Sequence, residues 1–464
     1  MHWKHVLIVV GLCLAVEFFP GQAVAGLSET QAAASWVDAR AYGAVGNGIT
    51  DDTIALQNAI DAAQAIGLPL FIPSPASEYL ITDRLLIDTS TVSVFGTGVD
   101  CVIRQATWGV PVFEVRADDV TIAGLYLEFT ATRTVISREP ADYVDGISAR
   151  AYCAAIYVAD SDRPTLKNIV ADGFVSGIFL RGVTAGLGLN EGAYIENLVA
   201  LNVDQGIVFG QQRGLRLQNL VAYDIARSQT EDATHAVYVL GLPYGNEVYN
   251  ERCIIDGVST WNNWGGGHAI QVKYLKESII RNVAAWNHPG LFLSRNMEYS
   301  IIANLKGYEL SRPEWGNALF HLSGTERRNL INNIYIENMS DGQIGLNVLG
   351  NAATGDSQGN TVWNFTIYDN SASPGNVVNL RGTRNRVINL RLICDGTPRK
   401  GFLVKNSSLV TMYNPSVVNG AGSYFFDIEP TAENTTLIYG DEQLDLANPG
   451  VYDDNGAWTT IVHN

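Results

Sequence analysis

A short apolar strand that carries an Asn or Gly at one fixed place recurs along most of the chain. LRLQNLVA around Asn219 and NRVINLRL around Asn389 are two copies. The anchor residues, in order, are Gly124, Asn168, Asn197, Asn219, Gly257, Asn282, Asn304, Asn333, Asn364 and Asn389. Most successive anchors lie 22 to 31 residues apart. This period, with β-branched strands and few helical runs, predicts a solenoid whose rungs stack into parallel sheets.

The recurrent Asn has a physical role in such a coil. At a tight bend its short amide tolerates left-handed backbone geometry, and stacked amides can hydrogen-bond from rung to rung. Leucine-rich repeats share the period, but their LxxLxL pattern is absent. A β-propeller would need a period of about 40–45 residues.

A second apolar strand follows each anchor and predicts a second parallel sheet. Its copies are GIVFG, HAVYVL, HAIQVK, GLFLSR, ALFHLS, IGLNVL, NVVNLR and GFLVK. Neighbouring parallel strands lie about 4.8 Å apart. Columns in the alignment should therefore be columns in space.

An amphipathic helix is expected ahead of the first rungs, at residues 53–65. Asp51 or Asp52 would be its N-cap. The residues expected on its buried face are Ile54, Ala59, Ile60 and Ala63. Such a helix would cover the open apolar end of the solenoid and its unpaired strand edges.

The opening of the chain resembles a known family. DARAYGAVGNGITDDTIALQNAIDAA, followed by LPLFIPSPASEYLIT and VSVFGTG, is similar to the start of the pectate-lyase-superfamily β-helix domain. The likeness covers about residues 36–105, and the rungs extend it to roughly residue 440. It implies an all-β, single-stranded, right-handed parallel β-helix with an N-terminal capping helix. Glycoside hydrolases similar to polygalacturonases and rhamnogalacturonases, C5-epimerases and phage tailspikes share this opening, so it does not indicate one reaction.

The N-terminal segment and the composition narrow the class of protein. Residues 1–25 resemble a secretory signal peptide, which predicts a secreted or periplasmic protein. We expect residues 26–464 to form one β-helix domain, with its repeated rungs within 118–440. We expect no membrane span. The net charge of −17 argues against a nucleic-acid partner. The cysteines and histidines have no metal-like spacing, so no metal site is predicted.

Four aromatic residues fall in one column of the first strand, four positions after the anchor. They are Tyr223, Trp261, Trp286 and Tyr308. Alternation along a strand would direct them outward. Their ring faces would suit sugar rings, which predicts a polysaccharide-binding surface. A covering loop or a neighbouring subunit is the alternative.

Candidate catalytic residues fall in the second strand. Lys273 and Arg295 lie 22 residues apart, about one rung, and should be side by side. Such a pair can support β-elimination on a uronate. The arginine would neutralise the uronate carboxylate, and the lysine would remove the proton on the carbon next to it. The nearby positive charge lowers the pKa of the lysine, so that it can act as a base. The pair is similar to the Lys/Arg arrangement of β-helix alginate lyases. The expected auxiliary residues are His268, Tyr238 and His321, with Gln271 as a further substrate contact.

Calcium ligands cannot be identified before Lys273, since residues 265–268 contain no acid. We therefore predict no cofactor, and calcium stays open. A hydrolase would instead need two carboxylates, for which the candidates are Glu231, Asp232 and Glu314. The sequence favours a polysaccharide lyase slightly over a glycoside hydrolase. A non-catalytic carbohydrate-binding or adhesion β-helix is the further alternative, as a monomer or homotrimer.

Overall fold

The computed structural model describes most of the chain. The described residues are 35–130 without residue 90, 153–182, 188–225, 234–241, 248–310, 318–337, 344–348, 357–369 and 377–394, with short strands elsewhere. The expected signal peptide at residues 1–25 lies outside them. No helix among the described residues is long and apolar enough to span a membrane.

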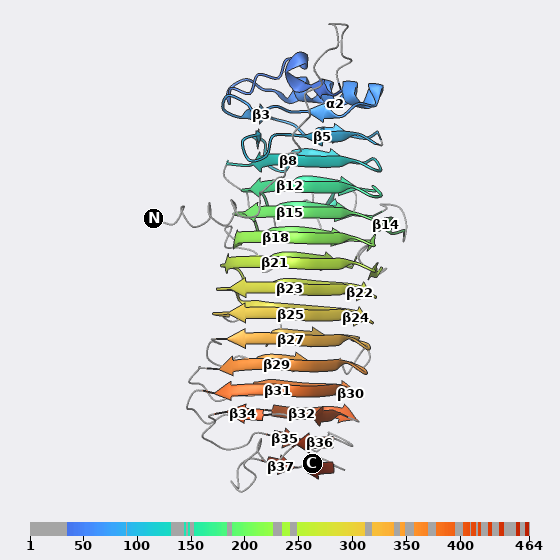
Figure 1. Ribbon diagram of the computed structural model, residues 1–464, viewed down its shortest axis with the longest axis vertical. Coiled ribbons are helices and arrows are strands. Elements are labelled where there is room, and N and C mark those ends of the chain that lie inside the picture. The colour runs from blue at the N-terminus through green and yellow to red at the C-terminus, as the bar shows by residue number, and fades with distance from the viewer. Residues whose placement is uncertain are drawn as a thin grey trace, which may run out of the picture.

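Two long parallel sheets form the molecule (Figure 1). Sheet A contains β1 (Val37–Asp38), β2 (Leu70–Phe71), β3 (Tyr79–Ile81), β5 (Ser93–Phe95), β6 (Val102–Gln105), β8 (Thr121–Glu128), β12 (Thr165–Asp172), β15 (Tyr194–Leu201), β18 (Arg216–Ile225), β21 (Ile254–Asn263), β23 (Ile279–Trp286), β25 (Ile301–Tyr308), β27 (Leu330–Glu337), β29 (Thr361–Asp369), β31 (Arg386–Cys394), β33 (Thr411–Tyr413), β34 (Ser416–Val418), β36 (Thr436–Tyr439) and β38 (Thr460–His463). The anchor residues of the sequence repeat lie in this sheet.

The second predicted strand forms sheet B. It contains β4 (Leu85–Ile87), β7 (Phe113–Val115), β11 (Ala154–Ala159), β13 (Ser176–Arg181), β14 (Asn190–Glu191), β16 (Gln205–Gly210), β17 (Gln212–Arg213), β19 (His235–Leu240), β20 (Asn250–Glu251), β22 (His268–Lys276), β24 (Gly290–Glu298), β26 (Ala318–Ser323), β28 (Ile344–Val348), β30 (Val378–Thr383), β32 (Phe402–Ser408), β35 (Phe426–Ile428) and β37 (Tyr452–Asp454). A separate antiparallel pair joins β9 (Tyr143–Val144) to β10 (Ile147–Ser148).

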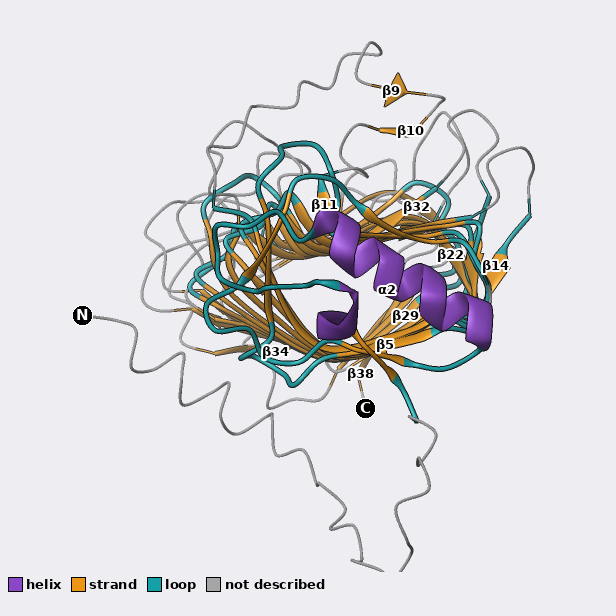
Figure 2. Ribbon diagram, turned by 90° about the horizontal axis from the view of Figure 1, so that it is seen from above, coloured by secondary structure: helices purple, strands orange, loops and turns teal. Residues whose placement is uncertain are grey.

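Successive rungs superimpose in the predicted register. In sheet A, for example, Leu220 pairs with Val258, and Val258 with Val283. Seen along the coil axis, the two sheets form opposite walls around one hydrophobic core (Figure 2). The chain is therefore an all-β, right-handed parallel β-helix, as predicted; nearly all parallel crossover connections have this hand.

The Asn column forms the expected ladder. Each anchor has left-handed backbone, from Gly124 at φ 68° to Asn389 at φ 51°. Side-chain amides donate from one rung to the preceding one, as in Asn304 Nδ2 to Asn282 Oδ1 at 3.1 Å and Asn333 Nδ2 to Asn304 Oδ1 at 3.2 Å. Gly257 interrupts the column, and Asn282 there donates to Asp256 at 2.7 Å.

A second ladder runs inside the coil where the chain enters sheet A. The side-chain oxygen of each residue accepts the backbone N–H one rung earlier, for example Ser300 N–H to Asn329 Oδ1 at 3.0 Å. Its members are Ser278, Ser300, Asn329, Asn360 and Asn385. These polar side chains are buried but satisfied, which fixes the register of the corner.

Helix α2 (Thr53–Ile66) lies across the N-terminal end of the coil (Figure 2). Its buried residues are Leu56, Ala59, Ile60 and Ala63. Ile54, expected on this face, is instead 75% exposed, because it lies about 200° around the helix from Leu56. Asp52 occupies the N-cap, but its carboxylate accepts the N–H groups of Val45 and Gly46, and it is Asp51 that binds the Thr53 N–H at 3.0 Å.

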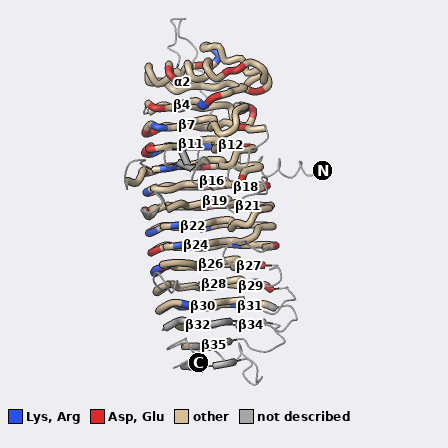
Figure 3. Tube along the Cα trace, turned by 180° about the vertical axis from the view of Figure 1, so that it is seen from behind, with Lys and Arg blue, Asp and Glu red and all other residues tan. Residues whose placement is uncertain are grey.

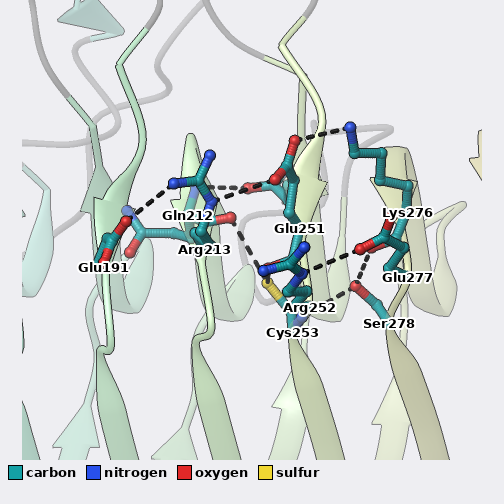
Figure 4. Close-up of polar contacts among 10 residues, drawn as sticks. Glu191, Gln212, Arg213, Glu251, Arg252, Cys253, Lys276, Glu277 and Ser278 are labelled. Carbon is teal, nitrogen blue, oxygen red and sulfur yellow. Dashed lines mark hydrogen bonds and ion pairs between the residues drawn. The ribbon is translucent and has the colours of Figure 1, made fainter.

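Charged side chains at one corner of the solenoid are paired with each other (Figure 4). Arg213 bridges Glu191 at 2.9 Å and Glu251 at 3.2 Å, and Lys276 contacts Glu251 at 2.8 Å. Partly exposed pairs of this kind contribute little to stability. They do show that cations at this corner have carboxylate partners.

Candidate active site on the outer face of sheet B

Side chains of sheet B that point away from the core form two columns. The first outward column contains Tyr157, Phe179, Val208, Tyr238, Gln271, Leu293, His321, Asn347 and Asn379. The second outward column, two residues further along each strand, contains Ala159, Arg181, Gly210, Leu240, Lys273, Arg295, Ser323 and Arg381. Residues between the columns, such as Val239 and Val272, belong to the core. Figure 3 views this side of the solenoid.

Much of the first outward column is buried although it lies outside the coil. Tyr157, Phe179, Val208, Tyr238 and Leu240 form a second apolar cluster, separate from the core, together with Ala154 and Ala159. Further along the same face, Gln271 and Lys273 are half-buried and Arg295 is exposed. The most accessible part of this face is therefore around Lys273 and Arg295.

Lys273 and Arg295 are direct register partners on β22 and β24, as the spacing predicted. The Lys273 Nζ also lies 5.2 Å from the ring centroid of Tyr238, over the ring face. This cation–π contact holds the ammonium group near the first outward column. Two cations one rung apart repel each other, which favours an anion between them.

Carboxylates are nearly absent from these columns. Between β7 and β30, the described residues of both columns include one acid, Glu114. Its buried carboxylate is already paired with Arg84 at 2.9 Å and with Arg116. From β11 to β30, the charged side chains among the described residues of the two columns are all cations.

His268 does not reach this face, so the prediction that it assists Lys273 is wrong. It lies two residues before Ile270 on the inward side of β22 and is fully buried. Its Nε2 donates to the carbonyl oxygen of Ala318 at 3.0 Å, and burial lowers its pKa to about 4. The glycine-rich residues 265–267 before it form a bend, and β22 begins at His268 with this side chain directed into the coil.

Two other histidines are buried near His268. The His235 Nδ1 donates to the His268 carbonyl oxygen at 2.8 Å, and the His288 Nε2 accepts from Asn263 at 3.1 Å. Burial holds the pKa of His235 well below its usual value and lowers that of His288 to about 3. These imidazoles are neutral parts of the interior.

His321 and Tyr238 do lie in the first outward column, as expected. His321 is 5% exposed, and burial, helped by the positive charge of Arg295, lowers its pKa to about 3. At neutral pH its imidazole is uncharged. It can therefore donate one N–H to a ligand, but it cannot supply a positive charge.

The aromatic column lies on the outer face of sheet A, where the rings stack on one another. Trp261 and Trp286 have centroids 4.8 Å apart and planes 4° apart, and Trp286 and Tyr308 are 5.5 Å and 12° apart. Tyr223 is the register partner of Trp261 on the preceding rung. Both faces of Trp286 are thus covered by neighbouring rings.

This stacking changes the expected substrate surface. A sugar ring packs against a free aromatic face, and the Trp286 ring has none. Sheets A and B are also opposite walls of the coil (Figure 2), so their outer faces point apart. The expectation that one substrate contacts both the aromatic column and the Lys273–Arg295 pair is therefore wrong.

The alternative hydrolase acids Glu231, Asp232 and Glu314 lie outside the described residues. Among the residues that are described, no group of three or more His, Cys, Asp or Glu side chains is arranged to hold a metal ion. Cys101, Cys153 and Cys253 are buried, and burial raises the pKa of the Cys101 and Cys253 thiols to about 12. These two thiols are chemically unreactive at neutral pH.

Arg181 and Arg381 in the second outward column were missed by the sequence reasoning. Arg381 ends the copy NVVNLR, and Arg181 ends the strand SGIFLR. Each lies two residues after a member of the first outward column. Extending the alignment by that offset would have found both.

Comparison with known proteins agrees with this architecture. PfbA, a surface adhesin of Streptococcus pneumoniae, superimposes with a TM-score of 0.51 at 12% identity, covering 90% of this chain and 99% of that chain. DFA-IIIase from Arthrobacter chlorophenolicus A6 without its lid gives 0.53 at 11% identity, with 92% and 98% covered. The catalytic domain of a GH87 alpha-1,3-glucanase in complex with nigerose gives 0.52 at 12%, with 87% and 67% covered. At such identities the likeness shows the fold alone.

No protein of curated function matches the chain by sequence. A family model described as rhamnogalacturonase A/epimerase, pectate lyase-like, matches residues 36–267, which is half of the 464 residues. The matched region runs from the segment before α2 to the turn that precedes β22. The chain therefore belongs to the rhamnogalacturonase A/epimerase, pectate lyase-like family.

Proposed function

We propose that this protein is a secreted enzyme that cleaves a uronate-containing polysaccharide by β-elimination on the outer face of sheet B. The observation that carries the proposal is the pairing of Lys273 with Arg295 in columns that, between β7 and β30, contain one acid among the described residues, Glu114, which is already ion-paired. An anionic polymer fits such a face better than a neutral one. The family and its fold neighbours include carbohydrate-active proteins, which is consistent with this substrate class.

The reaction needs two functions that these residues supply. The Arg295 guanidinium would bind the uronate carboxylate and neutralise the charge that develops on it. The Lys273 amine would take the proton on the carbon next to that carboxylate. A double bond then forms, the glycosidic bond breaks, and the departing oxygen takes a proton from a nearby donor.

The residues around the pair have supporting roles in this proposal. The adjacent guanidinium disfavours a second positive charge on Lys273. The Tyr238 ring positions the Lys273 side chain while it is an ammonium group. The Tyr238 hydroxyl and the neutral His321 imidazole are candidate donors to the departing oxygen. Half-buried Gln271 is placed to bind a sugar hydroxyl.

The test is incubation of the mature protein with uronate-containing polysaccharides, following both ultraviolet absorbance of an unsaturated product and new reducing ends. Elimination produces both signals. Reducing ends alone would indicate a hydrolase with acids such as Glu231, Asp232 or Glu314. Neither signal, with retained binding, would indicate a carbohydrate-binding or adhesion protein.

Variants assign the residues. Lys273→Met should lower kcat by about 10²–10⁴-fold, the usual contribution of a general base, and Arg295→Met should also raise KM. Lys306→Met removes an exposed lysine on the outer face of sheet A, so it should leave activity unchanged. Wild-type activity in Lys273→Met would remove that residue from the mechanism.

Export and assembly complete the proposal. A signal peptide at residues 1–25 would deliver the protein to the periplasm or the medium, where polysaccharides occur. N-terminal sequencing of the exported protein should find residue 26 or a near neighbour first. Light scattering would distinguish a monomer from a homotrimer.

A further inference from the structure

We propose that the acidic ligand lies parallel to the solenoid axis on sheet B, and that Arg181 and Arg381 bind its anionic groups on either side of the Lys273–Arg295 pair. This inference rests on the proposed function for the class of ligand. It adds two binding sites and an orientation of the ligand along the coil.

The register places the two arginines symmetrically. Arg181 pairs with Gly210, Gly210 with Leu240, and Leu240 precedes Lys273 by one rung. Arg381 likewise lies three rungs beyond Arg295 in the same column. At about 4.8 Å per rung, each arginine is about 14 Å from the central pair.

Arg181 is a buried cation, and none of the described acidic residues forms an ion pair with it. It is 6% exposed, and its Nε and Nη1 atoms are buried with no hydrogen-bond partner. A guanidinium is always charged in proteins, and burying an unpaired charge is costly. Its register neighbours are the small residues Ala159 and Gly210, and a planar carboxylate is the group that a guanidinium binds through two parallel hydrogen bonds.

The site around Arg381 combines a cation with hydrogen-bond acceptors. The Arg381 Nε is buried without a partner. In the adjacent first outward column, Asn347 and Asn379 are 4% and 8% exposed, and the Oδ1 atom of each has no partner. Amide oxygens accept from hydroxyls while the guanidinium binds a carboxylate. A uronate offers both groups.

The four cations together set a ligand length. From Arg181 to Arg381 there are seven rung steps, or about 34 Å. A ligand that reaches both arginines must be an extended polymer along the coil. Short fragments would reach only the central pair.

The experiment measures the affinity of the full chain for oligouronates of increasing length by isothermal titration calorimetry. Affinity should rise with length until the oligomer spans the row. Arg181→Met and Arg381→Met should each weaken binding of long oligomers by about tenfold, as for loss of a charged hydrogen bond, and leave short oligomers unchanged. Arg216→Met, an exposed arginine of sheet A, is the matched control.

The outcomes separate the two proposals. Equal losses for short and long oligomers, or unchanged affinity with an altered melting temperature, would overturn the assignment of Arg181 and Arg381. Length-dependent binding that needs both arginines, without cleavage, would support these sites and contradict the lyase. Cleavage with unchanged KM for long chains in both variants would support the lyase and contradict the assignment of Arg181 and Arg381.

Discussion

The Asn304 side chain donates a hydrogen bond of 3.1 Å to Oδ1 of Asn282 on the preceding rung, and the two residues have φ of 59° and 58°. Each ladder residue thus combines a left-handed bend with a bond between rungs. Asn suits both requirements, because its side chain is short and its amide both donates and accepts.

Asn304→Ala should lower the free energy of unfolding by about 2–4 kcal/mol, since it loses two ladder bonds and places a Cβ-bearing residue without a local hydrogen bond in left-handed backbone. Asn304→Gly should cost less, because glycine adopts this φ freely. Urea denaturation measures both. Asn58→Ala on the exposed face of α2 is the control, and equal losses in the Ala and Gly variants would contradict the role of φ.

The buried histidines predict loss of stability in acid. Their folded pKa values, about 4 for His268 and about 3 for His288 and His321, lie below the usual 6.5. The unfolded chain therefore binds protons that the folded chain does not, and stability falls as pH drops from 6.5 toward about 3, by on the order of 3 kcal/mol for each group.

Melting temperatures across this pH range test the histidine prediction. His288→Gln should flatten the acid side of the profile relative to wild type, whatever its effect at pH 8. A profile of unchanged slope in this variant would contradict a buried, neutral His288.

Glu326 should have the opposite pH dependence. Its carboxyl group is fully buried, with Ser294 Oγ at 3.1 Å and the Met297 N–H at 3.2 Å, and burial raises its pKa well above 4.5. The stability it contributes is present below the unfolded pKa and is lost as pH rises through the folded pKa. Glu326→Gln should therefore stabilise the protein on the alkaline side, by on the order of 1–2 kcal/mol.

Urea midpoints at pH 5 and pH 8 check the Glu326 prediction, with exposed Glu309→Gln as control. The gain from Glu326→Gln should grow with pH. A loss at pH 8 would mean that the carboxylate form is the one stabilised in the fold.

The Trp286 ring should act in the fold rather than in sugar binding. Trp286→Ala removes two stacked contacts and should lower stability by about 2–4 kcal/mol, with ligand affinity changed less than about twofold. Trp264→Ala, at a 64% exposed position, should alter stability little. If Trp286→Ala lost ligand affinity without losing stability, the aromatic column would again be the expected polysaccharide-binding surface.

The repeat predicted the fold and much of the candidate site. The Asn period fixed the rungs, and alignment of the second strand placed Lys273 beside Arg295, because stacked parallel strands turn sequence columns into spatial ones. Alternation also directed Trp261 and Trp286 outward correctly. It could not show that their faces meet, since ring orientation depends on rotamers.

His268 shows a different limit. It was expected to assist Lys273 because the two residues lie on the same strand, but alternation counted from Ile270 directs His268 inward. Arg181 was missed because its strand, which precedes the copies used for the alignment, was not included. The hydrolase acids stay a prediction, because Glu231, Asp232 and Glu314 lie outside the described residues.

The amide ladder contributes to the electric dipole moment of the molecule. Every Asn-to-Asn bond in the column, from Asn197 to Asn389, is donated toward the N-terminal neighbour. The amide dipoles therefore point head to tail along the rod and reinforce each other. The rod should carry a permanent moment along its length that is independent of its ionised groups, and it should align in an applied electric field even near its isoelectric point.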